Sequence, residues 1–117
     1  MSQLTDLMHR NLSEVFGQRD GEARRAAMRE LLAPDMTFSD HDGSVTGLDA
    51  IDRKIQALHA RTPGFVFTEA GPVHEVQELG SLDWSFGPAG ADPVVLGTDV
   101  VLIRDGRIAA LYTYLRS

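Results

Sequence analysis

The sequence contains no cysteine, which excludes disulfide bonds, thiolate nucleophiles and zinc sites built on sulfur. Positive charge is also scarce, since 17 acidic residues outnumber 11 basic ones and give a net charge of -6. Nucleic acids and anionic membranes would be repelled, so neither is expected as a partner. The N-terminal residues lack a basic stretch followed by an apolar one, and no apolar run reaches membrane-spanning length. A cytoplasmic protein is therefore expected.

Recognisable cofactor and nucleophile motifs are absent as well. The sequence has no phosphate-binding loop, dinucleotide fingerprint or serine nucleophile elbow, and the glycines of 87–90 flank a proline and open no helix. No cofactor is therefore expected. At 117 residues the chain is long enough for one modest hydrophobic core, which predicts a single domain over 1–117.

The first half of the chain has the periodicity of amphipathic helices. Apolar residues recur at helical spacing in three segments, which begin near residues 4, 20 and 46 and end at Gly17, Pro34 and Thr62. Asp20 can cap the second helix, and Pro34 ends it because the residue before a proline disfavours the helical conformation. Side chains expected on the solvent side of the helices include His9, Asp52, Lys54 and His59.

The second half reads as strands. Strand patterns cover 36–40, 82–86, 94–103 and 108–115, and 65–79 is a longer candidate that breaks around Gly71-Pro72. Asp105-Gly106 is a pair that hairpin turns favour. Helices followed by an antiparallel meander predict an α+β fold, in which a curved sheet wraps around a helical layer.

The strand 94–103 is apolar on both faces. Asp99 interrupts one face, and the other carries Leu96, Val100 and Leu102. A strand in an antiparallel sheet with one solvent-exposed face should alternate apolar with polar residues. The helices can cover only one face of the sheet. The pattern therefore predicts a homodimer formed sheet to sheet.

The segment "FSDHDG", residues 38–43, places three ionisable side chains at the end of a predicted strand. Asp40 shares the core-facing side with Phe38, whereas Asp42-Gly43 is a turn signal. Asp40 can be a working carboxylate or an ordinary turn aspartate. A metal site is not expected, because adjacent side chains diverge and no second pair of ligands at helical spacing accompanies them.

The segments "LLAPDMTFSDHDGSVTGLDAI" and "GTDVVLIRDGRI" resemble the nuclear transport factor 2-like superfamily, and within it the SnoaL-like polyketide cyclases and ketosteroid isomerases. The resemblance implies a cone of helices and curved sheet around an apolar pocket. It implies that Asp40 matches the catalytic base and that Asp99 matches the acid that hydrogen-bonds the developing enolate. The tyrosine that partners this acid in the isomerases has no counterpart, since Leu12 or Phe16 stands at the matching position.

Further residues are candidates with open alternatives. His41 can assist Asp40 or be a solvated loop residue, and His74 is predicted on a strand that lines the pocket in the family. Asp99 can instead be a paired structural carboxylate. The remaining candidates for the substrate pocket are Trp84, Phe38, Phe16 and Leu12, which can equally be plain core.

The leading interpretation is a cofactor-free enzyme that moves a proton alpha to a carbonyl of a small apolar substrate. Asp40 would be the base, Asp99 the acid or orienting group, and His41 a helper. The alternative is a non-catalytic module of the same fold that holds a ligand or a partner. A hydrolase of the limonene-epoxide type would need an inward arginine between two aspartates, and the predicted strands offer none.

Overall fold

A computed structural model describes residues 2–116. The helical elements are α1 (Gln3–Arg10), the π-helix η1 (Asn11–Phe16), α2 (Gly21–Leu31) and α3 (Leu48–Arg61). The strands are β1 (Leu32–Asp40), β2 (Gly43–Thr46), β3 (Phe65–Glu69), β4 (His74–Val76), β5 (Leu79–Pro88), β6 (Val95–Arg104) and β7 (Arg107–Arg116). None of the helices in this part of the chain is long and apolar enough to cross a bilayer.

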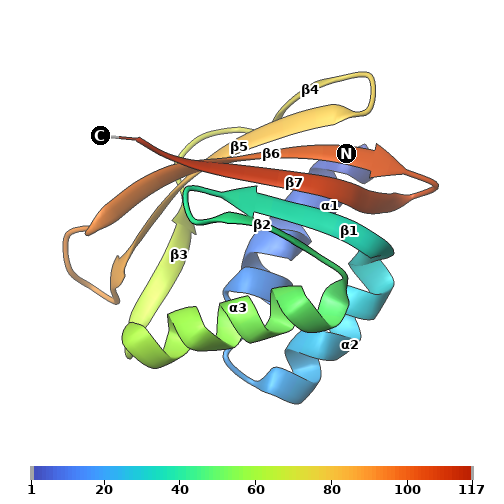
Figure 1. The fold of residues 1–117 in the computed structure, drawn as a ribbon. Helices are drawn as coiled ribbons and strands as arrows, with labels where there is room; N and C mark the ends of the chain where they lie inside the picture. The colour runs from blue at the N-terminus through green and yellow to red at the C-terminus, as the bar shows by residue number, and fades with distance from the viewer. Residues whose placement is uncertain (1, 117) are drawn as a thin grey trace.

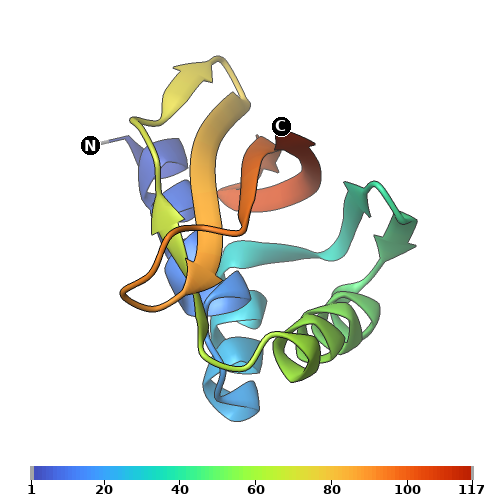
Figure 2. The same cartoon turned by 90° about the vertical axis from the view of Figure 1, so that its left-hand side faces the viewer.

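The strands form one curved sheet in the order β2-β1-β7-β6-β5-β3, with β4 paired to β5. The helices lie against its concave face, whereas the opposite face is bare (Figures 1 and 2). This confirms the α+β arrangement. The sheet is mixed, however, and not a pure antiparallel meander, because β1 and β7 are parallel and pair Phe38 with Leu111. The chain leaves β1 through β2 and α3, and its last strand then inserts between β1 and β6.

Several strand boundaries differ from those predicted. The expected long strand 65–79 is two strands: β3 pairs with Trp84–Pro88 of β5, and β4 pairs with Leu79–Ser81. The break falls around Gly71-Pro72, as the sequence indicated. β1 begins at Leu32, four residues before the predicted start, because the backbone becomes extended directly after α2 and ahead of Pro34.

The core lies between the helices and the concave face of the sheet. Its side chains come from the apolar stripes of the helices and from alternate positions of the central strands. The most buried of them include Met28, Leu31, Met36, Ile51, Ile55, Val101 and Leu111. The helical periodicity and the strand alternation therefore predicted most of the buried apolar side chains correctly.

A polar cluster between α2 and α3 departs from the sequence expectation. Asp52 is buried, not solvated, and accepts a 2.7 Å hydrogen bond from Nε of Arg24, which is itself 2% exposed. His59 is half-buried and also not on the open surface: its Nε2 lies 2.7 Å from the carbonyl oxygen of Phe16. Burial lowers the pKa of His59, so the neutral ring donates to that carbonyl. The hydrophobic pattern did not reveal these pairings, because both partners are polar.

The C-terminal end of α3 is fixed by Arg19. Its guanidinium donates to the carbonyl oxygens of His59 (3.1 Å), Thr62 (2.6 Å) and Phe65 (2.9 Å). Carbonyls at a helix C-terminus lack partners within the helix, so an external cation satisfies them and stabilises the helix end. The last turn of α3, which carries Arg61, is therefore held against the segment that joins η1 to α2.

The convex face of the sheet carries exposed apolar side chains. They lie on β5, β6 and β7 and include Leu79, Leu96, Leu102, Tyr112 and Tyr114, which are 36–55% exposed. Register places them on one side, since Leu79 pairs with Leu102 and Thr98 with Tyr114. The other face of β6 is buried under the helices, so both of its faces are apolar as the sequence indicated.

Candidate functional site

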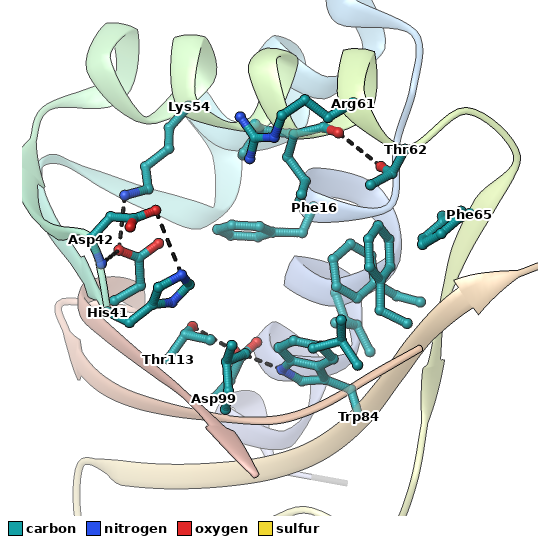
Figure 3. Close-up of a pocket in the computed structure, with 18 of the residues that line it drawn as sticks. Phe16, His41, Asp42, Lys54, Arg61, Thr62, Phe65, Trp84, Asp99 and Thr113 are labelled. Carbon is teal, nitrogen blue, oxygen red and sulfur yellow. Dashed lines mark hydrogen bonds and ion pairs between the residues drawn. The ribbon is translucent and has the colours of Figure 1, made fainter. Parts of the chain in front are cut away.

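A cavity of about 400 Å³ lies between α3, η1 and the concave face of the sheet (Figure 3). Seven of the eight residues singled out in the sequence line it: Leu12, Phe16, Phe38, Asp40, His41, Trp84 and Asp99. They come from η1, the end of β1 and the central strands β5 and β6. The rim is open where Asp42, Arg61, Val94 and Leu115 line the cavity with exposed side chains.

Aromatic rings form most of the apolar wall. Phe16 and Phe38 meet edge to face at 5.2 Å between ring centroids, and Phe67 makes the same contact with Trp84. Phe67 also stacks on Phe86 at 4.2 Å. Such pairs favour fixed ring positions, so the wall presents a shaped apolar surface to a ligand.

The π-helix η1 supplies the other part of this wall. The N–H of Gly17 bonds to the carbonyl of Leu12, which is the five-residue step of a π-helix. The wider turn places Leu12 and Phe16 on the cavity side. Both are buried and apolar, so η1 contributes shape to the cavity and no hydrogen-bond donor from these side chains.

Asp99 is a buried carboxyl group on β6, and no cation of the described residues bonds to it. Its Oδ1 accepts two hydrogen bonds, from Nε1 of Trp84 (2.9 Å) and Oγ1 of Thr113 (2.8 Å). Oδ2 has no hydrogen-bond partner among residues 2–116 and is not sealed from the cavity. Burial raises the pKa of Asp99 to about 6, against the two hydrogen bonds, which lower it. The group can therefore hold a proton on Oδ2 up to about pH 6.

The position of the Trp84 ring depends on a glycine in the neighbouring strand. Trp84 pairs with Gly97 across β5 and β6, and a Cβ on Gly97 would lie 2.3 Å from Cζ2 of the ring. The indole therefore lies flat over the Gly97 backbone, from where its N–H reaches Asp99, two residues further along β6. The orientation of Asp99 thus depends on Trp84, and the position of Trp84 depends on the glycine at residue 97.

Asp40 lies at the end of β1 beside a cation. Its Oδ1 accepts hydrogen bonds from Nζ of Lys54 (2.9 Å) and from the backbone N–H of Asp42 (2.9 Å). Its side chain is 12% exposed, and Lys54 also lies 5.5 Å above the Phe38 ring. Asp40 is therefore both the turn aspartate and a cavity-lining carboxylate, so the two readings of "FSDHDG" describe the same residue.

His41 and Asp42 lie on the open side of the cavity. Their side chains are 61% and 68% exposed, and Nε2 of His41 lies 3.6 Å from Oδ2 of Asp42. The strand end turns His41 toward the cavity, but its nearest carboxylate is Asp42 and not Asp40. Within residues 2–116 no group of three histidine, aspartate or glutamate side chains is arranged to hold a metal ion.

Asp40 and Asp99 have similar hydrogen-bond arrangements but different electrostatic surroundings. Each has one oxygen fixed by two donors and leaves the other oxygen without a partner among the described residues. Asp40 has a charged partner, Lys54, whereas the donors to Asp99 among the described residues are neutral and Asp99 is buried. Pairs of carboxyl groups in such contrasting surroundings can divide the roles of base and acid.

His74 does not belong to this site. It lies on β4, is exposed, and pairs with Ser81 at the start of β5, away from the cavity-lining half of that strand. The break at Gly71-Pro72 is the reason: β3 continues the cavity wall, whereas β4 shifts to the outer end of β5. The predicted placement of His74 in the pocket is therefore wrong.

The lining residues missed in the sequence include Lys54, Arg61 and Thr113. Lys54 was expected to face solvent, yet it stands three residues after Ile51 and four before Leu58, on the inward face of α3. Arg61 follows at the same spacing. Thr113 alternates with Leu111 and Leu115 on β7 and pairs with Asp99 in register. Helical and strand periodicity could have identified all three.

The SnoaL-like domain model matches residues 10–111. No protein of curated function matches the chain in sequence. Among solved structures, a proposed isomerase of the SnoaL-like family from Agrobacterium tumefaciens C58 is 25% identical, with a TM-score of 0.92 and full coverage of both chains.

Two more distant structures share the fold. A proposed SnoaL-like polyketide cyclase from Jannaschia sp. CCS1 is 18% identical, with a TM-score of 0.81 over 97% of this chain and 85% of that one. A proposed ketosteroid isomerase from Kribbella flavida is 14% identical, with a TM-score of 0.70 over 98% and 78%. The fold is thus of the nuclear transport factor 2-like type. With the domain model covering most of its length, the chain belongs to the family of SnoaL-like domain proteins.

Proposed function

We propose that the protein is a cofactor-independent enzyme that moves a proton alpha to a carbonyl group in a small, mostly apolar substrate. The observation that carries this proposal is the pair of carboxyl groups on one cavity, one beside a cation and one buried among neutral donors. The isomerase and cyclase names of the structural neighbours agree with it.

In the proposed step Asp40 is the base. Its free oxygen takes a proton from the carbon next to the carbonyl, and the electron pair of that C–H bond moves into the carbonyl to form an enolate or enol. Asp99, protonated on Oδ2, donates a hydrogen bond to the carbonyl oxygen, where negative charge develops. Return of the proton from Asp40 to the same or a conjugated carbon completes an exchange, an isomerisation or part of a cyclisation.

The oxyanion site of this chain differs from that of the ketosteroid isomerases. By the resemblance, Leu12 or Phe16 stands where the donor tyrosine of those enzymes would be, and both are buried apolar residues of the cavity wall. Trp84 and Thr113 bond to Asp99 and not to the substrate position. A single donor, Asp99, would therefore act on the substrate oxygen. This favours a substrate whose enolate is already stabilised over a simple steroid ketone.

The alternative function is a non-catalytic module that uses the same cavity to hold an apolar ligand. A lining of aromatic rings is compatible with it. The two functions differ in one respect: a binding module has no use for two carboxyl groups with free oxygens that face the ligand.

Deuterium exchange separates the two functions. 2-Tetralone, a bicyclic ketone whose C1 enolate is stabilised by conjugation with its aromatic ring, would be followed by proton NMR in deuterium oxide. We expect the wild-type protein to accelerate exchange, and Asp40→Asn and Asp99→Asn to reduce it by about 100-fold each. Exchange that is unchanged in both variants would reject these carboxyl groups. Binding of the ketone without any exchange would favour the binding module.

We also propose that the partner on the convex face is a second copy of this chain. The exposed apolar side chains of β5, β6 and β7 form a continuous surface on the bare side of the sheet. Exposed apolar surface of this kind is typical of an interface between protein chains. A dimer formed in this way would leave both cavities open, because they lie on the opposite face of each sheet.

A further inference from the structure

Arg61 is a cation at the rim of the cavity, on the last turn of α3. Lys54, Leu58 and Arg61 are spaced by four and three residues and therefore lie on one face of the helix. All three line the cavity. Figure 3 shows the guanidinium of Arg61 and the ammonium of Lys54 on the α3 side of the cavity, opposite Asp99 and Trp84.

The charges around the cavity are paired except at this point. Lys54 bonds to Asp40 at 2.9 Å, and His41 lies near Asp42 at 3.6 Å. Arg61 makes no hydrogen bond or ion pair through its side chain with any residue of the described chain, 2–116. Its guanidinium is therefore a free cation that faces the cavity, whose other lining side chains are apolar or have their charges paired.

Helix stability alone does not explain this placement. A cation in the last turn of a helix interacts favourably with the helix dipole, and this accounts for a basic residue near the end of α3. The dipole makes no distinction between sides of the helix, and Ala60 in the same turn is exposed and would serve as well. The position of Arg61 on the cavity side calls for a second reason.

We propose that Arg61 binds an acidic group of the substrate, so that the cavity selects mostly apolar carbonyl compounds that also carry a carboxylate. The inference rests on the proposed function in taking this cavity as the reaction site. The apolar body of the substrate lies against the aromatic wall, its reacting carbonyl lies at Asp99, and its carboxylate lies at the rim. A planar guanidinium with several N–H donors is well suited to this contact.

Two further features agree with this selection. With a net charge of -6 the protein as a whole repels anions, whereas a free cation at the rim attracts an acidic group locally to the cavity. Arg61 also stands seven residues, or roughly 10 Å along the helix, from Lys54. The carboxylate would therefore be separated from the carbon next to Asp40 by a body of about two fused rings.

The test compares a matched pair of ligands by isothermal titration calorimetry. 2-Naphthoate carries a carboxylate, and 2-naphthamide has nearly the same shape without the charge. We expect wild-type protein to bind 2-naphthoate at least about fivefold more tightly than the amide. Arg61→Gln should make the two affinities equal, whereas Arg61→Lys should keep part of the preference.

Arg53→Gln is the matched control, because Arg53 is exposed on the same helix and does not line the cavity. It removes the same charge and should keep the preference. Equal affinities in the wild type, no binding of 2-naphthoate, or an unchanged preference in Arg61→Gln would each overturn the inference. The measurement involves no reaction, so failure of deuterium exchange with the preference intact would count against the proposed function and not against this contact.

Discussion

The indole N–H of Trp84 and the carboxyl group of Asp99 are joined by a 2.9 Å hydrogen bond between adjacent strands of the sheet. The bond uses Oδ1, which also accepts from Thr113. It therefore orients the buried acid so that the other oxygen faces the cavity. The predictions below follow from this arrangement and from the polar contacts that support it.

The buried acid should reduce the stability of the fold as pH rises. Because the pKa of Asp99 is raised to about 6, the folded protein holds a proton that the unfolded chain releases between about pH 4 and pH 6. Stability contributed by this group is present at low pH and falls as pH rises through this window. Asp99→Asn removes the penalty and should stabilise the protein near pH 8 by up to roughly 3 kcal/mol.

The measurement is urea unfolding of both proteins across this range of pH. The gain of Asp99→Asn over wild type should be largest near pH 8 and vanish at about pH 3, where both states of the wild type hold the proton. A difference that does not depend on pH would mean that Asp99 is not the titrating group.

Exchange activity should have an upper pH limit set by the same group. If protonated Asp99 donates to the substrate oxygen, kcat/KM for exchange should decrease about tenfold per pH unit above about pH 6. Asp99→Asn should show a lower rate without this decrease, because an amide does not titrate. A rate that rises through the same range would instead identify ionised Asp99 as the base.

Gly97→Ala should displace the Trp84 ring from its position over β6. The new Cβ would lie 2.3 Å from Cζ2 of Trp84, so the ring must move and its bond to Asp99 is lost. We expect destabilisation by about 1–3 kcal/mol, as for overpacked cores, and a shift of the indole N–H signal in NMR spectra. Gly71→Ala is the control, because a Cβ there meets nothing within 4 Å. An unmoved indole signal would contradict the proposed dependence of Trp84 on Gly97.

The ion pair between α2 and α3 should make a large contribution that depends on both partners. Asp52→Ala leaves Arg24 buried without its carboxylate and should cost about 3–5 kcal/mol in urea unfolding. Arg25→Ala should cost under about 1 kcal/mol, since Arg25 is 48% exposed and lies 3.5 Å from the same aspartate. Similar losses of unfolding free energy in both variants would show that burial of the Arg24–Asp52 pair does not determine its contribution to stability.

Association through the convex face should respond to charge. Leu96→Glu together with Leu102→Glu places two carboxylates on the exposed apolar surface of β6, and we expect a dimeric wild type to become monomeric in sedimentation velocity. Val94→Glu, at the cavity rim and away from the convex face, should leave the dimer intact. A wild type that is monomeric at all concentrations would reject the proposal.

Much of this site was predictable because it interrupts regular patterns. Asp99 was identified as the one polar residue on an apolar strand face, and Asp40 by its position beside Phe38 at the end of a strand. Trp84 followed from alternation along its strand. In each case the period of a strand, two residues, determines the face directly from the sequence.

The missed parts depend on contacts between distant segments. The cation that bonds Asp40 comes from a helix 14 residues later, and the half-buried state of His59 depends on a carbonyl 43 residues earlier. The parallel pairing of β1 with β7 depends on the path of the whole chain. Local periodicity contains no information on such pairings. It also misplaced His74, because the predicted strand breaks at Gly71-Pro72 and the strand that carries His74 pairs away from the cavity.

Trp84 has a consequence for experiments on this protein, because it is the only tryptophan in the chain. Its indole lines the cavity and bonds to the buried acid, so its fluorescence emission arises entirely from the candidate site. Ligand entry and ionisation of Asp99 should each alter that emission. Intrinsic tryptophan fluorescence of the unlabelled protein therefore reports occupancy of the cavity, and no added dye is needed.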